Sequence, residues 1–201
     1  MPLENERKFV LQLKPQAVLN DLFWSLDSTG VPDIKIFEQY YLNDSCRIRA
    51  EANVGADPRW NVPTGPRWQR MFNFKKKVNN ETVELEQKLL TPDFQKLVTV
   101  AESSLHKYRA AIEAGNYIWE VDFFVPQDTA GIEFRQRILH SYLIMAEVEM
   151  EESEKAPDSV PDFITKNLVY TVPANDLRFK SHNLTDPEQT RMLMDRVKRA
   201  S

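Results

Sequence analysis

Glycine is scarce in this sequence: only 5 of its 201 residues are glycine, and neither GxGxxG nor GxxxxGK[ST] occurs. A glycine-rich loop that holds phosphate through backbone N–H groups is therefore excluded. The single cysteine, Cys46, excludes a disulfide framework and a cysteine-rich zinc site. The three histidines lack the paired spacing of a zinc motif. Any phosphate or metal chemistry must therefore use charged side chains other than histidine.

Long apolar runs are also missing. No run approaches the roughly 20 residues of a membrane-spanning helix, and the acidic N-terminus lacks the apolar core of a signal peptide. A net charge of −4 argues against a dedicated nucleic-acid binder. Apolar residues make up 42% of the chain, which allows a packed core. We expect a cytoplasmic protein that binds a small molecule, and neither membrane nor nucleic acid, with its oligomeric state left open.

Period-two alternation of polar and apolar residues, which is typical of half-buried strands, recurs along the chain. It predicts strands at residues 3–11, 35–42, 46–51, 69–78, 82–88, 106–112, 117–125 and 143–151. A ninth, shorter extended segment is predicted at 177–181. Helical patterns lie between them, at 15–26, 91–103 and 159–167 and after Thr185.

Two segments have the composition of loops. Residues 53–67 carry three prolines and two glycines, which predicts an insertion between two strands. Residues 153–161 are polar and rich in proline. Strand patterns continue on both sides of each segment, so neither divides the chain. We predict one domain over residues 1–184, followed by a C-terminal helix over 185–201.

Like charges recur two residues apart inside the predicted strands, a spacing that places both side chains on one face. Seven such pairs occur: Glu4/Glu6, Arg47/Arg49, Lys75/Lys77, Glu84/Glu86, Lys107/Arg109, Glu120/Asp122 and Glu147/Glu149. For any single pair, a solvent-exposed sheet face is the better interpretation. Like charges placed opposite each other destabilise a sheet, however. Seven pairs of uniform sign therefore favour the inside of a closed barrel, where ligands supply the missing counter-charge.

The two signs of charge predict two kinds of ligand. Rows of carboxylates without histidine or thiolate select hard cations such as Mg²⁺ or Mn²⁺. Rows of arginine and lysine select a polyanion, most naturally phosphate. Several cations in one cavity repel each other unless the ligand is highly charged, which favours a triphosphate over a monophosphate. Carboxylates, cations and a metal together are the components of phosphoryl-transfer sites.

The segment Glu4-Asn5-Glu6-Arg7-Lys8 resembles the ExExK signature of the CYTH proteins, also called triphosphate tunnel metalloenzymes. The resemblance continues in order through seven further segments: 40–42, 47–49, 72–75, 83–86, 105–109, 119–123 and 146–149. It covers about residues 2–151, with a fainter match at 176–184. It implies an α+β fold in which an eight-stranded antiparallel β-barrel forms a tunnel, with helices packed outside.

The same resemblance implies roles for individual residues. The metal ligands for Mg²⁺ or Mn²⁺ would be Glu4, Glu6, Asp122, Glu147 and Glu149. The residues that bind the phosphates would be Lys8, Arg47, Arg49, Lys75, Lys77, Lys107, Arg109 and, from the C-terminal region, Lys180. The catalytic set would be Lys75, Glu84 and Glu86, with the two glutamates orienting basic residues or a water.

The expected activity is metal-dependent hydrolysis of a triphosphate, either inorganic tripolyphosphate or an organic one. Water would attack the terminal phosphorus and orthophosphate would leave. Two alternatives remain open. One is an adenylyl cyclase of the class IV kind, which makes cyclic AMP and pyrophosphate from ATP. The other is a non-catalytic binder of a polyphosphorylated ligand, which the two intact carboxylate pairs at 4/6 and 147/149 disfavour.

Overall fold

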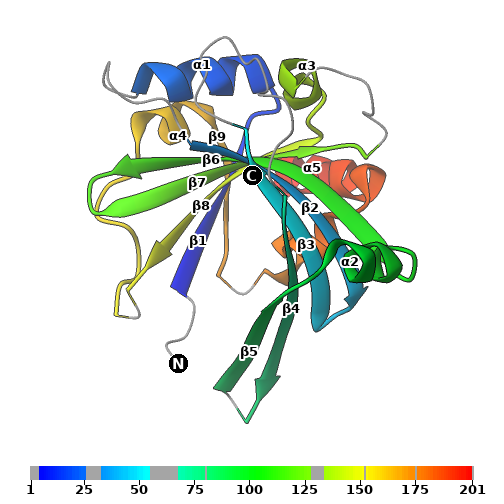
Figure 1. Ribbon diagram of the computed structural model, residues 1–201. Helices are drawn as coiled ribbons and strands as arrows, with labels where there is room; N and C mark the ends of the chain where they lie inside the picture. The colour runs from blue at the N-terminus through cyan, green and yellow to red at the C-terminus, as the bar shows by residue number, and fades with distance from the viewer. Residues whose placement is uncertain are drawn as a thin grey trace.

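The computed structural model describes residues 5–25, 33–54, 68–79, 81–127, 134–151, 153–174 and 176–200. Nine antiparallel strands form one curved sheet in the order β5-β4-β3-β2-β6-β7-β8-β1-β9 (Figure 1). The predicted α+β class and the antiparallel pairing are confirmed. The eight-stranded closed barrel is a correction: over the described residues the sheet has nine strands and stays open, with β5 and β9 as its edges.

The strands follow the alternating segments of the sequence. They are β1 Asn5–Leu11, β2 Asp33–Asn43, β3 Cys46–Asn53, β4 Gln69–Val78, β5 Glu81–Lys88, β6 Ser103–Ala114, β7 Tyr117–Val125, β8 Leu143–Met150 and β9 Leu168–Val172. The helices are α1 Pro15–Ser25, α2 Thr91–Val98, α3 Phe134–Leu139, α4 Asp162–Asn167 and α5 Pro187–Ala200, with short 3₁₀ helices η1 Leu177–Phe179 and η2 Ser181–Leu184.

The eight main strand predictions are confirmed to within a few residues, whereas the ninth strand was misplaced. Residues 177–181 form 3₁₀ turns, opened by the Asp176 side chain, which accepts a hydrogen bond from the Arg178 backbone N–H. The ninth strand is instead β9, which pairs with β1 directly after α4. The predicted insertion at 53–67 lies outside the described residues except for its first two positions. Over the described chain, no helix is both long and apolar enough to cross a bilayer.

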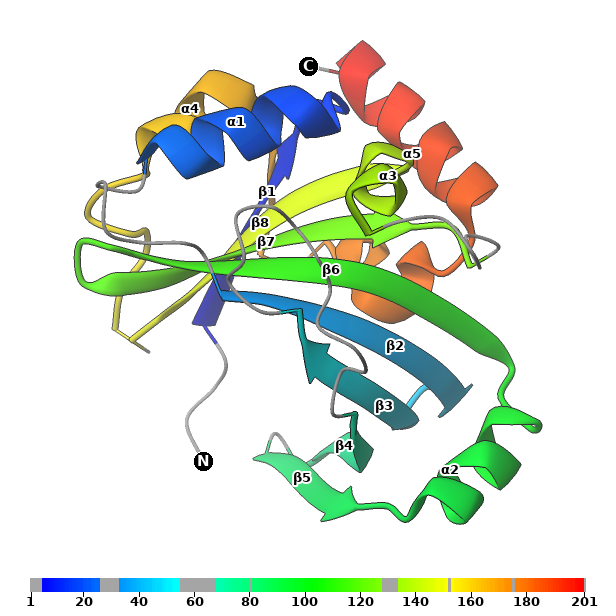
Figure 2. The same cartoon turned by 45° about the horizontal axis from the view of Figure 1, so that its top comes forward.

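Two apolar clusters cover opposite faces of the sheet. On β7, Trp119 and Phe123 point toward α1, α3 and α4 and are almost completely buried. Phe124, one position further, points to the other face and packs with residues of η1, η2 and α5. Figure 2 shows α1 and α4 side by side in one layer, with α5 apart from them. The strict alternation of strand side chains therefore places these two clusters on opposite faces of the sheet.

The face beneath η1, η2 and α5 changes character along each central strand. On β6, Leu105 is buried in the apolar cluster, whereas Lys107 and Arg109, two and four residues later on the same face, line a cavity. On β8, Met145 is followed in the same way by Glu147 and Glu149. The helices thus cover the apolar half of this face, and the charged half beyond them forms the candidate site.

Candidate functional site

A cavity of about 1030 Å³ lies over the charged half of this face. Its lining includes seven of the expected phosphate-binding residues: Lys8, Arg47, Arg49, Lys75, Lys107, Arg109 and Lys180. Five glutamates also line it: Glu6, Glu84, Glu120, Glu147 and Glu149. These residues come from strands at both ends of the sheet and from the η1–η2 segment. The fold therefore collects charges that lie up to 174 residues apart in the chain, Glu6 and Lys180, onto one surface.

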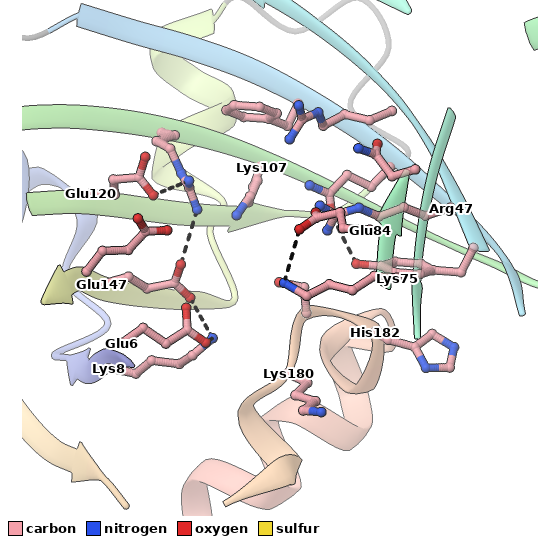
Figure 3. Close-up of a pocket in the computed structure, with 18 of the residues that line it drawn as sticks. Glu6, Lys8, Arg47, Lys75, Glu84, Lys107, Glu120, Glu147, Lys180 and His182 are labelled. Carbon is pink, nitrogen blue, oxygen red and sulfur yellow. Dashed lines mark hydrogen bonds and ion pairs between the residues drawn. The ribbon is translucent and has the colours of Figure 1, made fainter. Parts of the chain in front are cut away.

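Carboxylates dominate the side of the cavity that β1, β7 and β8 form. Glu6 on β1 lies directly opposite Glu149 on β8, and Glu120 on β7 lies directly opposite Glu147 on β8. Figure 3 shows Glu6, Glu120 and Glu147 together on this side, with Lys8 among them. Like charges directly opposite each other are destabilising in a sheet. This side of the cavity therefore requires cations.

Lys8 provides one of these cations. Its Nζ lies 3.0 Å from Glu6 Oε1 and 3.1 Å from Glu147 Oε1. Burial by itself would lower the pKa of Lys8, but the two carboxylates outweigh burial and raise it. The ammonium is therefore charged across the physiological pH range.

Arg109 provides the second cation and binds three carboxylates. Its guanidinium meets Asp122 through two parallel hydrogen bonds, each 2.7 Å long. It also donates to Glu147 Oε2 at 3.2 Å and to Glu120. Burial would lower the pKa of Arg109, but these carboxylates, Asp122 first, raise it. A planar guanidinium can form this many directed bonds at once, whereas an ammonium cannot.

Asp122 lies beneath the cavity floor. It has no exposed surface and bonds both Arg109 and Lys107, the latter only 3% exposed. Burial would raise the pKa of Asp122, but the two cations hold it at about 2. The carboxylate is therefore ionised at neutral pH and neutralises part of the buried positive charge.

Phe37 on β2 contacts three of the cations at once. The charged groups of Arg49, Lys107 and Arg109 lie 5.6, 5.7 and 5.5 Å from the centroid of its ring. A phenyl face attracts each cation electrostatically, by about 0.5–2 kcal/mol depending on solvation. The ring therefore helps three like charges to lie around one point, which no sequence pattern had indicated.

Basic and amide side chains dominate the opposite side, formed by β3, β4 and β5. Lys75 Nζ lies 3.8 Å from Glu84 Oε2, and Arg49 Nε lies 3.1 Å from Glu51 Oε2. Figure 3 shows Arg47 and Lys75 on this side, across Lys107 from Glu120 and Glu147. Lys180, exposed at the junction of η1 and η2, also lines the cavity. The cavity thus has an acidic side and a predominantly basic side.

The remaining predicted residues lie outside the cavity lining or outside the described chain. Glu86 is beside the site: its carboxylate accepts a hydrogen bond from Asn73 and lies 4.0 Å from Arg49. Asp122 is buried below the floor, as described above. Glu4 falls outside the described residues, as does the side chain of Lys77. Their roles stay predictions.

Several lining residues were not among the predicted set. The like-charged pairs of the sequence placed Glu120 inside the predicted barrel together with Asp122, but no role was assigned to it. The rings of Tyr41 and His182 are in tilted contact, with their centroids 4.8 Å apart. His182 comes from η2, so its place in the lining depends on tertiary packing and not on a local pattern.

The carboxylates have the hard oxygen donors that Mg²⁺ and Mn²⁺ prefer, but in the described part of the chain no three acidic, histidine or cysteine side chains converge on one point. Between Glu6 and Glu147 the position is taken by the Lys8 ammonium. The donor set therefore suits a metal chemically, and a bound ion would have to replace that ammonium.

Comparison with known proteins assigns no family. No family model and no curated protein matches the chain. Similar solved structures include a candidate adenylate cyclase from Bacillus halodurans, at 14% identity and a TM-score of 0.41 over 74% of this chain and 81% of that one. A protein from Pyrococcus horikoshii matches at 14% sequence identity with a TM-score of 0.40, over 82% of this chain and 84% of that one. A chain of the Schizosaccharomyces pombe Mediator head module matches at 12% sequence identity with a TM-score of 0.44, over 95% of this chain and 94% of that one. Likenesses this distant identify neither family nor activity.

Proposed function

We propose that the protein is a metal-dependent triphosphatase of the CYTH type that hydrolyses a triphosphate in the charged cavity. The observation that carries the proposal is the division of one cavity into an acidic side, where carboxylates lie opposite each other, and a basic side of arginine and lysine. A solvent-exposed sheet would be more stable with mixed signs. The segregation supports a ligand that combines a polyanion with a hard cation.

The basic side binds the phosphates in this proposal. Arg47 and Arg49 offer planar forks for phosphate oxygens, while Lys75, Lys107 and Lys180 act as point charges. Each phosphate group of a triphosphate would then meet more than one cation. Neutralising charge on the transferring phosphoryl group is the main catalytic contribution that such residues make.

The acidic side holds the metal in this proposal. Glu6, Glu147 and Glu149, joined by Glu120, would supply the oxygen ligands. When bound, Mg²⁺ or Mn²⁺ would neutralise phosphate oxygens and lower the pKa of an attacking water. The Lys8 ammonium, which now lies between Glu6 and Glu147, would turn toward the phosphates. Glu84 would keep Lys75 oriented, since the two side chains lie 3.8 Å apart.

The experiment is a comparison of tripolyphosphate, ATP and thiamine triphosphate, each with Mg²⁺, Mn²⁺ or EDTA, with products resolved by ³¹P NMR. Metal-dependent release of orthophosphate supports the proposal and names the substrate class. Formation of pyrophosphate and a cyclic nucleotide from ATP would contradict the triphosphatase and support the adenylyl cyclase instead. Tight binding without any product would leave a non-catalytic binder.

A further inference from the structure

A second cavity, of about 1020 Å³, lies next to the charged one. Its wall combines the first residues of β6, the end of β7, η2 and the first turns of α5. Leu177 and His182 line both cavities, so the two adjoin along the η1–η2 segment. Figure 3 shows His182 on this segment, beside the charged site.

The wall of the second cavity differs chemically from that of the first. Leu105, Tyr142 and Leu193 supply apolar surface. Its guanidinium and carboxylate groups are already engaged: the guanidinium of Arg178 pairs with Asp176 at 2.7 Å, and the carboxylate of Asp186 accepts backbone hydrogen bonds at the start of α5. The cavity therefore suits an uncharged group with an apolar body.

Two hydroxyl groups of this wall have no partner. Among the described residues, the buried side-chain atoms without a hydrogen bond include Ser103 Oγ and Thr190 Oγ1, and both residues line the second cavity. Thr190 is only 1% exposed. An unpaired buried polar group is costly.

A guest in this cavity could satisfy these atoms. Rotation about χ1 re-aims a serine or threonine hydroxyl without movement of the backbone, and a hydroxyl both donates and accepts. Heterocyclic bases and sugars carry matching groups along their edges. The volume is at the upper end of the roughly 300–1,000 Å³ that ligand pockets occupy.

We propose that the second cavity binds the uncharged organic end of a nucleoside triphosphate, while its phosphates lie among the cations of the first cavity. The inference rests on the proposed triphosphatase function for its phosphate half. It makes an organic triphosphate, and not inorganic tripolyphosphate, the preferred ligand. Thr190 and Ser103 then contact the base or the sugar and determine specificity.

The test measures dissociation constants by calorimetry for ATP, GTP, CTP, UTP and tripolyphosphate in the wild type and in Thr190→Val, Ser103→Ala and Thr171→Val. Thr171 is an exposed residue of β9 that lines neither cavity, so it is the matched control for Thr190. Valine replaces an unpaired hydroxyl by a methyl group of similar size, so the melting temperature of Thr190→Val should not fall.

We expect the best nucleoside triphosphate to bind the wild type more tightly than tripolyphosphate. Thr190→Val should weaken the binding of that nucleoside triphosphate roughly fivefold, the usual effect of one hydrogen bond. The same substitution should change the binding of tripolyphosphate less than twofold. Equal weakening of both ligands, or no preference for any nucleoside triphosphate in the wild type, would overturn the inference. The wild type could prefer a nucleoside triphosphate, and Thr190→Val could lose this preference, while no triphosphate is hydrolysed. In that case the second cavity still binds the organic end of the ligand, and the proposed hydrolysis fails.

Discussion

Glu120 and Glu147 lie directly opposite each other on β7 and β8, and one arginine, Arg109, donates hydrogen bonds to both. Two adjacent carboxylates on a sheet face repel each other. The guanidinium between them offsets this repulsion. In the proposed function the same two carboxylates bind Mg²⁺ or Mn²⁺. The residues that Arg109 stabilises in the cavity are therefore the ones that the proposed function uses.

Glu147→Gln should remove metal-dependent turnover, by about two orders of magnitude or more, because one proposed metal ligand and the partner of both Lys8 and Arg109 is lost. Glutamine keeps the size of the side chain, so the fold should persist. Phosphate release under saturating Mg²⁺, with circular dichroism on the same sample, measures both effects. Glu113→Gln, at an exposed end of β6, is the control. Full activity of Glu147→Gln would contradict the assignment.

Asp122→Asn should destabilise the fold strongly. It leaves Lys107 and Arg109 partly or fully buried without their shared counter-charge, and breaking a buried ion pair on one side costs about 3–5 kcal/mol. Urea unfolding followed by fluorescence gives the change in the free energy of unfolding. Asp93→Asn, at an exposed position of α2, should change it by less than about 0.5 kcal/mol. If Asp122→Asn lowers the free energy of unfolding no more than Asp93→Asn does, the buried ion pair does not contribute to stability.

The same carboxylate predicts an acid-dependent loss of stability. The pKa of Asp122 is about 2 in the folded protein, below its ordinary value of 3.8. Its contribution is therefore complete above about pH 4 and is lost as the pH falls toward 2. The difference in unfolding free energy between wild type and Asp122→Asn should shrink over this interval. A difference that is constant from pH 5 to pH 2 would contradict the ion pairing.

His106 predicts a second pH effect at milder acidity. Burial lowers its pKa from 6.5 to about 4, so the unfolded chain binds the proton more tightly than the folded protein. The free energy of unfolding should fall as the pH decreases from about 6.5 to about 4. His106→Leu should flatten this slope, whereas His140→Leu, at an exposed position, should leave it unchanged. Identical slopes for wild type and His106→Leu between pH 7 and 5 would reject the prediction.

Lys180→Ala should weaken triphosphate binding about tenfold, since an exposed cation at the mouth of the cavity is removed without disturbing the core. The melting temperature should stay the same. Because the interaction is electrostatic, the difference from the wild type should decrease as salt rises. Titrations at 50 and 300 mM salt measure this, with Lys198→Ala on an exposed position of α5 as the control. Unchanged affinity at low salt would remove Lys180 from the site.

Local patterns were sufficient to predict the main strands, because the period-two alternation of a strand depends only on its own residues. β4 and β7 match the predicted bounds of 69–78 and 117–125. The same alternation indicated that Lys107 and Arg109 share a face, as they do in the cavity lining. The short elements α3 and β9 were missed, because six or five residues are too few for a periodic signal.

The tertiary structure decided which groups the charged side chains of the strands contact. The sequence by itself determined which residues alternate and which carry like charge. It could not determine that the sheet stays open over the described residues, since closure depends on whether the edges β5 and β9 meet. Nor could it determine that Asp122 would be buried under two cations, that Phe37 would contact three cations, or that His182 would line two cavities. Each of these depends on contacts between segments far apart in the chain, which only the folded protein brings together.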